Sequence, residues 1–274
     1  MKYINHKRLR KVLNLDDIEA ANEYINTLSE ADRAKYIDDN GQLWSELRGE
    51  MWRLGGHKCW YSEAFIQEQS GHIEHFRPKK RLHGLEKGQR HNGYWWRAFD
   101  WENFRLAHPT CNVRVTDYLS GKKVGKGSYF PLKDESMRAI DKAGELHETP
   151  VLLDPCKSGD SELICYRLDS GKPIASVQPV NGGFSSEQDE WDHYRAVQTI
   201  EYFHLDEGTW NTDRKDLIDE VVVLCDLIIK EKNKKPIDQP EYRRLIAELT
   251  NYLEKHEPFI SVVEQVLKEK CLLI

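Results

Sequence analysis

The sequence lacks any long apolar run. Within its 274 residues, no stretch approaches the roughly 18 consecutive apolar residues that a transmembrane helix needs. The opening residues, Met-Lys-Tyr-Ile-Asn-His-Lys-Arg, contain no apolar stretch of the kind found in secretory signals. We therefore expect a cytoplasmic protein without a membrane partner.

Internal repeats and low-complexity segments are also absent, which excludes solenoid architectures.

Cysteine is scarce. The six cysteines lie at positions 59, 111, 156, 165, 225 and 271. They are too sparse in a chain of this length to form the framework of a small disulfide-stabilised domain. Reduced thiols or a metal site are favoured instead.

The charge of the chain is unevenly distributed. The net charge is −6, which argues against contact with nucleic acid because phosphate binding needs a basic surface. Between Arg77 and Arg138, however, 14 Lys and Arg stand against 6 Asp and Glu, a local net charge of +8. This window predicts a phosphate-binding surface. The alternative is a solvated basic loop without a ligand.

Helical periodicity occurs at both ends of the chain. The first predicted helix follows a capping carboxylate and places Ala20, Tyr24, Ile25 and Leu28 on one face. The predicted helices cover residues 16–28, 43–53, 189–204, 213–233, 239–256 and 258–270. The clearest apolar face comprises Leu217, Val221, Leu224 and Ile228.

The centre of the chain has a different pattern. From Cys59 to Leu132, short apolar pieces alternate with loops rich in Gly, Lys and Arg, and two short strands or extended segments are expected between 150 and 180. These patterns predict an α+β fold. The expected division is an N-terminal helical segment (1–56), a small mixed module (57–135) and a mostly helical region (136–274).

The dipeptide Glu74-His75 is the first sign of chemistry. Phosphodiester hydrolysis needs a base to activate water and a cation to stabilise charge on the phosphate. A carboxylate and an imidazole would supply these, although side chains of neighbouring strand residues point to opposite faces. We therefore expect a bent or bulged strand that aims both inward. A lone Glu-His pair is more often a solvated charge beside a polar ring.

The residues around this dipeptide strengthen the signal. Segment 100–112 adds Asn103, His108, Cys111 and Asn112. The wider pattern consists of Cys-x-Tyr-x-Glu (59–63), Ile-Glu-His-Phe-Arg-Pro-Lys (73–79), Tyr-Trp-Trp-x-Ala-Phe-Asp-Trp-x-Asn (94–103), Cys-Asn (111–112) and Phe-Pro-Leu (130–132). It resembles the PtuB family, the HNH endonucleases associated with retrons and Septu-type antiphage systems. The resemblance covers roughly residues 45–220.

This resemblance implies a ββα-metal module with helices on both sides. Two short strands would carry the segments of His75 and Asn103, and a helix would begin near Cys111. His75 would be the general base, and Asn103 would brace the loop that orients it. Glu74 and Asn112 would hold one Mg²⁺ or Mn²⁺ through oxygen atoms. Without the family pattern, the two asparagines are more typical of turns or caps.

A structural zinc is the main point of departure from this class of nucleases. Many members have two Cys-x-x-Cys pairs, whereas this chain has Cys59-x-x-Ser62 and His108-x-x-Cys111. Only three soft ligands remain where a closed zinc site needs four. His57 is a fourth candidate, awkwardly close to Cys59. Otherwise the two cysteines are small buried thiols.

Basic and aromatic residues near the dipeptide predict contacts with nucleic acid. The expected phosphate-binding residues are Arg77, Lys79, Lys80, Arg81, Arg105 and Arg114. The aromatic segment 94–101 offers rings on which bases could stack, although packing over the small module is the favoured interpretation.

The resulting hypothesis is a metal-dependent endonuclease that cuts DNA, with RNA as the alternative substrate. The resemblance implies that it is the effector of a defence complex with an ATPase partner of the PtuA kind, in which it could also self-associate. The acidic helices after residue 185 offer a docking surface or, equally, pack within the chain. The competing hypotheses are a non-catalytic nucleic-acid-binding or scaffold module with a degenerate metal site, and a hydrolase of small phosphorylated molecules.

Overall fold

The computed structural model describes residues 1–85, 89–118, 121–254 and 257–272. Its helices are α1 (Asp16–Ile25), α2 (Glu30–Asp39), α3 (Gln42–Ser45), α4 (Arg48–Leu54), α5 (Pro109–Asn112), α6 (Glu187–Tyr202), α7 (Gly208–Lys232), α8 (Gln239–Asn251) and α9 (Ile260–Glu269). Its strands are β1 (His72–His75), β2 (Phe104–Ala107), β3 (Val115–Thr116), β4 (Lys123–Val124), β5 (Ile164–Tyr166) and β6 (Pro173–Ala175). Three antiparallel pairs, β1–β2, β3–β4 and β5–β6, are each separate sheets. The fold is therefore α+β.

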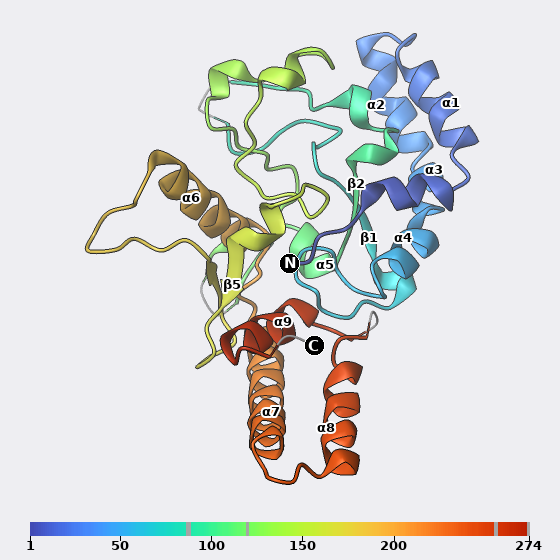
Figure 1. Ribbon diagram of the computed structural model, residues 1–274. Helices are drawn as coiled ribbons and strands as arrows, with labels where there is room; N and C mark the ends of the chain where they lie inside the picture. Colours follow the sequence, from blue (N-terminus) through green and yellow to red (C-terminus); the bar gives the residue numbers. More distant parts are fainter. Residues whose placement is uncertain (86–88, 119–120, 255–256, 273–274) are drawn as a thin grey trace.

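Helices α1 to α4 lie together on one side of the β1–β2 hairpin (Figure 1). Helix α1 buries Ile18, Ala21 and Ile25, which recur every three or four residues. The predicted face was therefore partly wrong, because Ala20 and Tyr24 are exposed. The predicted helix over 43–53 is divided into α3 and α4.

The β1–β2 hairpin is the centre of the predicted module. Its register is continuous, with Glu74 opposite Arg105 and His75 opposite Phe104, so the bulge expected from sequence is not present. Both faces of the hairpin are covered, and Glu74 and His75 are each buried. The short helix α5 follows β2 and packs against β1. The order of these elements is strand, strand, helix.

The β5–β6 pair confirms strands between residues 150 and 180, although both lie in the second of the two expected segments. The turn between them includes Gly171, whose φ is 67°. A Cβ atom there would lie 2.2 Å from the carbonyl oxygen of Asn211 on α7. Only glycine allows this close approach of the turn to the helix.

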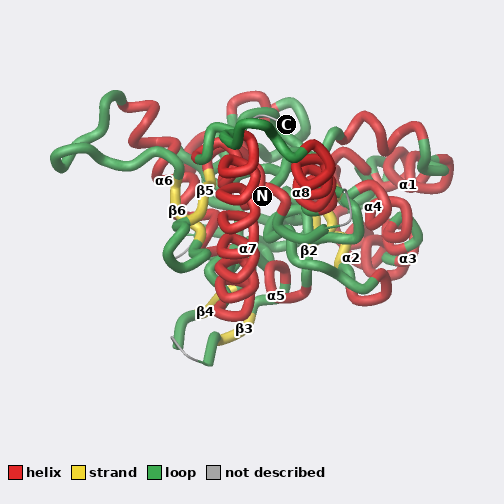
Figure 2. The backbone as a smooth tube through the Cα atoms, turned by 60° about the horizontal axis from the view of Figure 1, so that its bottom comes forward, coloured by secondary structure: helices red, strands yellow, loops and turns green. Residues whose placement is uncertain are grey.

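The C-terminal helices follow the predicted periodicity closely. Helices α7 and α8 lie side by side (Figures 1 and 2) and extend away from the rest of the molecule, as Figure 1 shows. Val221, Leu224 and Ile228 on α7 are buried as expected, and Leu217 is half-buried. The predicted helix over 239–256 ends at Asn251, and residues 255–256 lie outside the described part.

Among the residues that the structure describes, no helix combines the length and apolarity required to cross a membrane. The division of the chain at residues 56 and 135 stays a prediction.

Candidate functional site

A cavity of about 170 Å³ lies at the C-terminal end of β1. Glu74 and His75 from β1 line it together with Asn112, the last residue of α5. Lys79 and Lys80 form part of its wall. Residues that the sequence analysis selected from two separate motifs, 73–79 and 111–112, therefore face one cavity.

His75 has a fixed orientation inside the protein. Its side chain is packed edge-on against the rings of Trp44 and Phe104. Nε2 lies 2.9 Å from the carbonyl oxygen of Ala98, and since a carbonyl can only accept, Nε2 carries the proton. The lone pair is therefore on Nδ1, which lies 3.3 Å from the ammonium of Lys79.

The pKa of His75 lies well below its usual value. Burial is the largest cause, and the positive charges of Lys79 and Lys126 act in the same direction. Burial also lowers the pKa of Lys79, to about 8. His75 is consequently a neutral imidazole at neutral pH, and the lone pair on Nδ1, which faces Lys79, can accept a proton as a general base requires.

Glu74 is held by a lysine that the sequence analysis missed. The fully buried ammonium of Lys126 forms an ion pair with Oε1 of Glu74 and donates a hydrogen bond of 2.8 Å to the carbonyl oxygen of His75. The hydroxyl of Tyr61 donates to Oε2 of Glu74 at 2.8 Å. Gly125 sets the path of the backbone before Lys126, because a Cβ there would lie 1.9 Å from the carbonyl oxygen of Val113. Gly125 and Lys126 lie in a polar stretch of sequence, and nothing in that stretch indicates that the ammonium of Lys126 is buried.

Asn103 ties together the two ends of the segment that connects β1 to β2. Its Oδ1 accepts from the backbone N–H of Arg77 at 2.8 Å, and its Nδ2 donates to the carbonyl oxygens of Arg77 and Arg97 at 2.9 and 3.1 Å. These bonds fix the chain just after His75, as the predicted bracing role requires.

Comparison with known proteins identifies one relative. Septu protein PtuB of Bacillus mycoides (strain KBAB4) is 30% identical over 168 residues, which cover 58% of this chain and 52% of that protein. The chain is similar to PtuB over this stretch and spans about half the length of this curated relative. No family model matches. The resemblance to the PtuB family is thereby confirmed.

The donor set at this cavity suits a hard cation. Mg²⁺ is commonly held by one or two protein oxygen ligands together with water and substrate phosphate. The carboxylate of Glu74 and the side-chain amide of Asn112 face the same cavity and offer oxygen atoms of this kind. The amide nitrogen of Asn112 lies 3.3 Å from Nδ1 of His72, which leaves the amide oxygen for another partner. A cation at Oε1 of Glu74 has to share that oxygen with Lys126 or displace it.

The predicted zinc ligands are brought together only in part. The Sγ atoms of Cys59 and Cys111 are 3.8 Å apart, and Ser62 donates its backbone N–H to Cys59. His108 uses Nδ1 to accept from the backbone N–H of Thr110 at the start of α5. The ring of His57, the fourth candidate, is stacked on Trp52.

These thiols are satisfied by one another. Burial raises the pKa of Cys59, but hydrogen bonds from Cys111 and Ser62 outweigh it and lower that pKa to about 6. Burial raises the pKa of Cys111 well above its usual value. Within the described residues, no three His, Cys, Asp or Glu side chains gather to hold a metal. This pair therefore does not fit a closed four-ligand zinc site.

The six predicted phosphate contacts have different surroundings. Lys79 and Lys80 line the His75 cavity, and Arg81 lies close by. Arg114 covers the ring of Tyr129 and donates to the carbonyl oxygen of Gly125 at 3.1 Å. Arg77 pairs with Glu148 at 3.0 Å and is mostly buried.

Arg105 requires a correction. It is 4% exposed, and its guanidinium forms a two-pronged pair with Asp154 at 2.6 Å. Its side chain is thus a structural ion pair and cannot reach a phosphate. The basic sequence around Arg105 suggests a surface residue. It does not show that β2, on which Arg105 lies, is buried on both faces.

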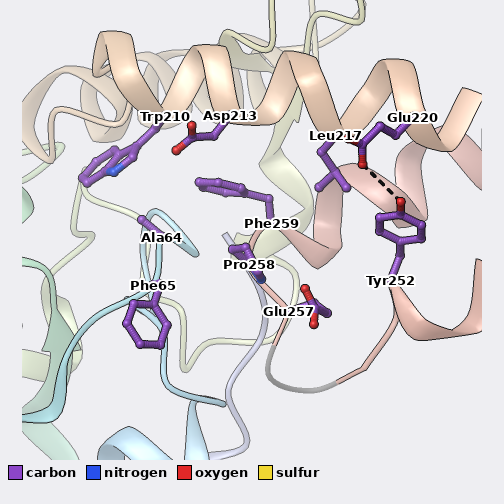
Figure 3. Close-up of a pocket in the computed structure, with 10 residues that line it drawn as sticks. All are labelled: Ala64, Phe65, Trp210, Asp213, Leu217, Glu220, Tyr252, Glu257, Pro258 and Phe259. Atoms are coloured by element: carbon purple, nitrogen blue, oxygen red, sulfur yellow. Dashed lines mark hydrogen bonds between the residues drawn. The ribbon is translucent and has the colours of Figure 1, made fainter.

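A larger cavity, of about 380 Å³, lies between α7 and the segment before α9 (Figure 3). Its walls are apolar and acidic and include Trp210, Phe259, Asp213 and Glu220, the last of which accepts from Tyr252. Of the described residues that line it, none is Lys, Arg or His. A phosphate would be repelled there, so the smaller cavity is the candidate site.

Proposed function

We propose that the chain is an HNH-type endonuclease that hydrolyses phosphodiester bonds of nucleic acid with the help of Mg²⁺ or Mn²⁺. The observation that carries the proposal is the cavity that joins Glu74, His75 and Asn112, with His75 held as a neutral base. The order β1, β2, α5 supports a ββα-metal module.

His75 performs the first step in this proposal. Nδ1 takes the proton from the attacking water, and the bond from Nε2–H to Ala98 stabilises the imidazolium that forms. Lys79 lies 3.3 Å from Nδ1 and has to turn away to admit the water, which brings its ammonium toward a bound phosphate.

The other residues bind and orient. A divalent ion held by Glu74 and Asn112 would stabilise negative charge on the phosphate. Lys126 and Tyr61 keep the carboxylate of Glu74 in place. Asn103 fixes the loop after His75 and thereby the position of the imidazole.

The biological setting follows from the relative. Since the homologue is a Septu protein, we place this nuclease in antiphage defence, with DNA as the first substrate, RNA as the second, and an ATPase subunit as partner. Helix α7 exposes Val223 (60%) and Leu227 (45%), which supports a docking surface on the C-terminal helices.

The runner-up is a binding module without catalysis. It is favoured by Glu74, whose two carboxylate oxygens are both engaged by Lys126 and Tyr61 and so already have a structural role. In this alternative the basic residues hold nucleic acid and His75 is a buried core histidine.

Cleavage assays separate the two functions. Plasmid DNA and tRNA are incubated with the protein in Mg²⁺ or Mn²⁺, alone and with the ATPase subunit, and wild type is compared with His75→Ala and with His147→Ala, an exposed histidine. The nuclease proposal expects cutting by wild type and His147→Ala only. Equal cutting by all three, or none by wild type with the partner present, contradicts it.

A further inference from the structure

A third cavity, of about 590 Å³, adjoins the His75 cavity and shares Lys79 and Lys80 with it. Its other walls come from α2, from Arg81 and from Trp95. The hydrolysis proposed above uses none of these walls. The volume lies within the usual range for small-molecule sites, roughly 300–1,000 Å³.

One side of this cavity is apolar and its rim is basic. Helix α2 contributes Ala31, Ala34 and Ile37, which present little side-chain bulk. Four of the lining residues are Lys or Arg, against one acidic residue, Glu30. Glu30 in turn accepts a hydrogen bond of 2.5 Å from the side-chain amide of Asn92. The charge therefore favours an anionic ligand with an apolar part.

Trp95 gives the cavity an aromatic surface. Its neighbours Tyr94 and Trp96 are buried, but Trp95 is only half-buried and lines the cavity. The guanidinium of Arg33 lies 3.6 Å from the centre of the Trp95 ring. Nε of Arg33 is buried and finds no hydrogen-bond partner among the described residues. A ring and a stacked guanidinium are the two surfaces on which proteins stack unpaired bases.

We propose that this cavity receives an unpaired nucleotide of the same strand whose scissile phosphate lies at His75. The base occupies the apolar side beside Trp95 and Arg33, and Lys79 and Lys80 lie between it and the cleavage site. A base paired inside a duplex cannot reach the cavity, so the ligand is a single strand. The position of the scissile phosphate rests on the proposed function, whereas the nucleotide site does not require cleavage.

Binding measured without cleavage tests the site. In a His75→Ala background, affinity is measured by fluorescence anisotropy for a short single-stranded DNA and for the same sequence as a blunt duplex. Trp95→Leu, which keeps apolar volume but loses the ring, should weaken single-strand binding roughly ten- to a hundredfold and leave duplex binding almost unchanged. Trp95→Phe should retain most of the affinity.

A matched pair elsewhere in the chain provides the control. Trp191 on α6 is also half-buried and has a cation, Lys133, 4.8 Å from its ring centre, but it lines neither this cavity nor the His75 cavity. Trp191→Leu should therefore leave single-strand binding unchanged. A second probe leaves Trp95 intact: Ala34→Glu puts a carboxylate on the exposed cavity face of α2 and should weaken the same binding, whereas Ala20→Glu on α1 should not.

The outcomes distinguish the site from the nuclease function. If Trp95→Leu weakens duplex and single strand equally, or Trp191→Leu has the same effect, the proposal is wrong. If free dAMP binds saturably on its own, the cavity takes a free nucleotide. The proposal that the nucleotide belongs to a strand is then wrong. If no variant cuts nucleic acid but the Trp95-dependent preference holds, the nucleotide site stands and only the nuclease proposal fails.

Discussion

Two neighbouring places in this chain have the residues that the sequence predicts to bind metal, and their surroundings differ. At the oxygen site, Glu74 is paired with the ammonium of Lys126 beside an open cavity. At the sulfur site, the Sγ atoms of Cys59 and Cys111 are 3.8 Å apart, and among the described residues no third His, Cys, Asp or Glu joins them in a group that could hold a metal. The first site has its polar residues at a cavity, whereas both residues of the second are buried.

Under the proposed function, the chain would bind a catalytic metal without the structural metal. The strands and α5 are held by buried side chains such as Phe104, Leu106 and Cys111, each at most 1% exposed. Each apolar side chain of that size contributes about 1.5–3 kcal/mol when buried. Packing can therefore hold the hairpin where a zinc ion would otherwise be needed, while the cavity keeps its polar residues.

The largest expected effect is on activity at the oxygen site. His75→Ala removes the base and should lower kcat for DNA cleavage about 10²- to 10⁴-fold. The exposed His147→Ala variant should keep wild-type rates, as measured by the initial rate of plasmid nicking. A loss of less than tenfold in His75→Ala would assign the base to another group.

Lys126 should be the most important residue for stability at the same site. Lys126→Met leaves the carboxylate of Glu74 buried without its counter-charge, which should lower the free energy of unfolding by about 3–5 kcal/mol. Urea denaturation measures this change, and Lys123→Met, an exposed neighbour on β4, is the control. The double variant Lys126→Met/Glu74→Gln should recover part of the loss; if it is no more stable than Lys126→Met, the ion pair is not the cause.

Acid should destabilise the region beside the sulfur site through His6. This side chain packs against Trp101 and the edge of Trp60, and burial lowers its pKa to about 3. The unfolded chain binds a proton near pH 6.5 and the folded one does not, so stability falls as the pH drops from 6.5 toward 3. At pH 4 the loss is at most roughly 3 kcal/mol. In urea melts at pH 7 and pH 4, His6→Gln should show a smaller pH effect than wild type, and His147→Gln the same effect as wild type.

The sequence predicted the structure well where a residue pattern occurs in few structural contexts. The helical periodicity predicted α6 to α9, and the Glu-His dipeptide with the distant Asn112 predicted residues that meet in one cavity. It was uninformative where burial decides the role. Arg105 and Lys126 look like members of one basic surface, yet both are buried in ion pairs with Asp154 and Glu74. Only the tertiary arrangement distinguishes a buried ammonium from a phosphate contact.

The unbroken hairpin gives the same lesson. Alternation along a strand predicted that Glu74 and His75 could share a site only where the strand is bent or bulged. The register is regular, yet both residues line the cavity at the end of β1. The alternation of residues along a strand gives the direction of each side chain. It does not show which segments of the chain cover each face of the strand.

The smallest effect is expected from removing metal at the sulfur site. A structural zinc would contribute on the order of 10 kcal/mol, so chelation would unfold a protein that depended on it. Because Cys59 and Cys111 are satisfied by each other and by Ser62, EDTA should leave the melting temperature unchanged, and purified protein should contain far less than one zinc per chain. Cys111→Ala should cost about 1–2 kcal/mol through the lost packing of one small buried side chain. Stoichiometric zinc in elemental analysis, or unfolding on chelation, would make the two sites alike and remove the contrast between them.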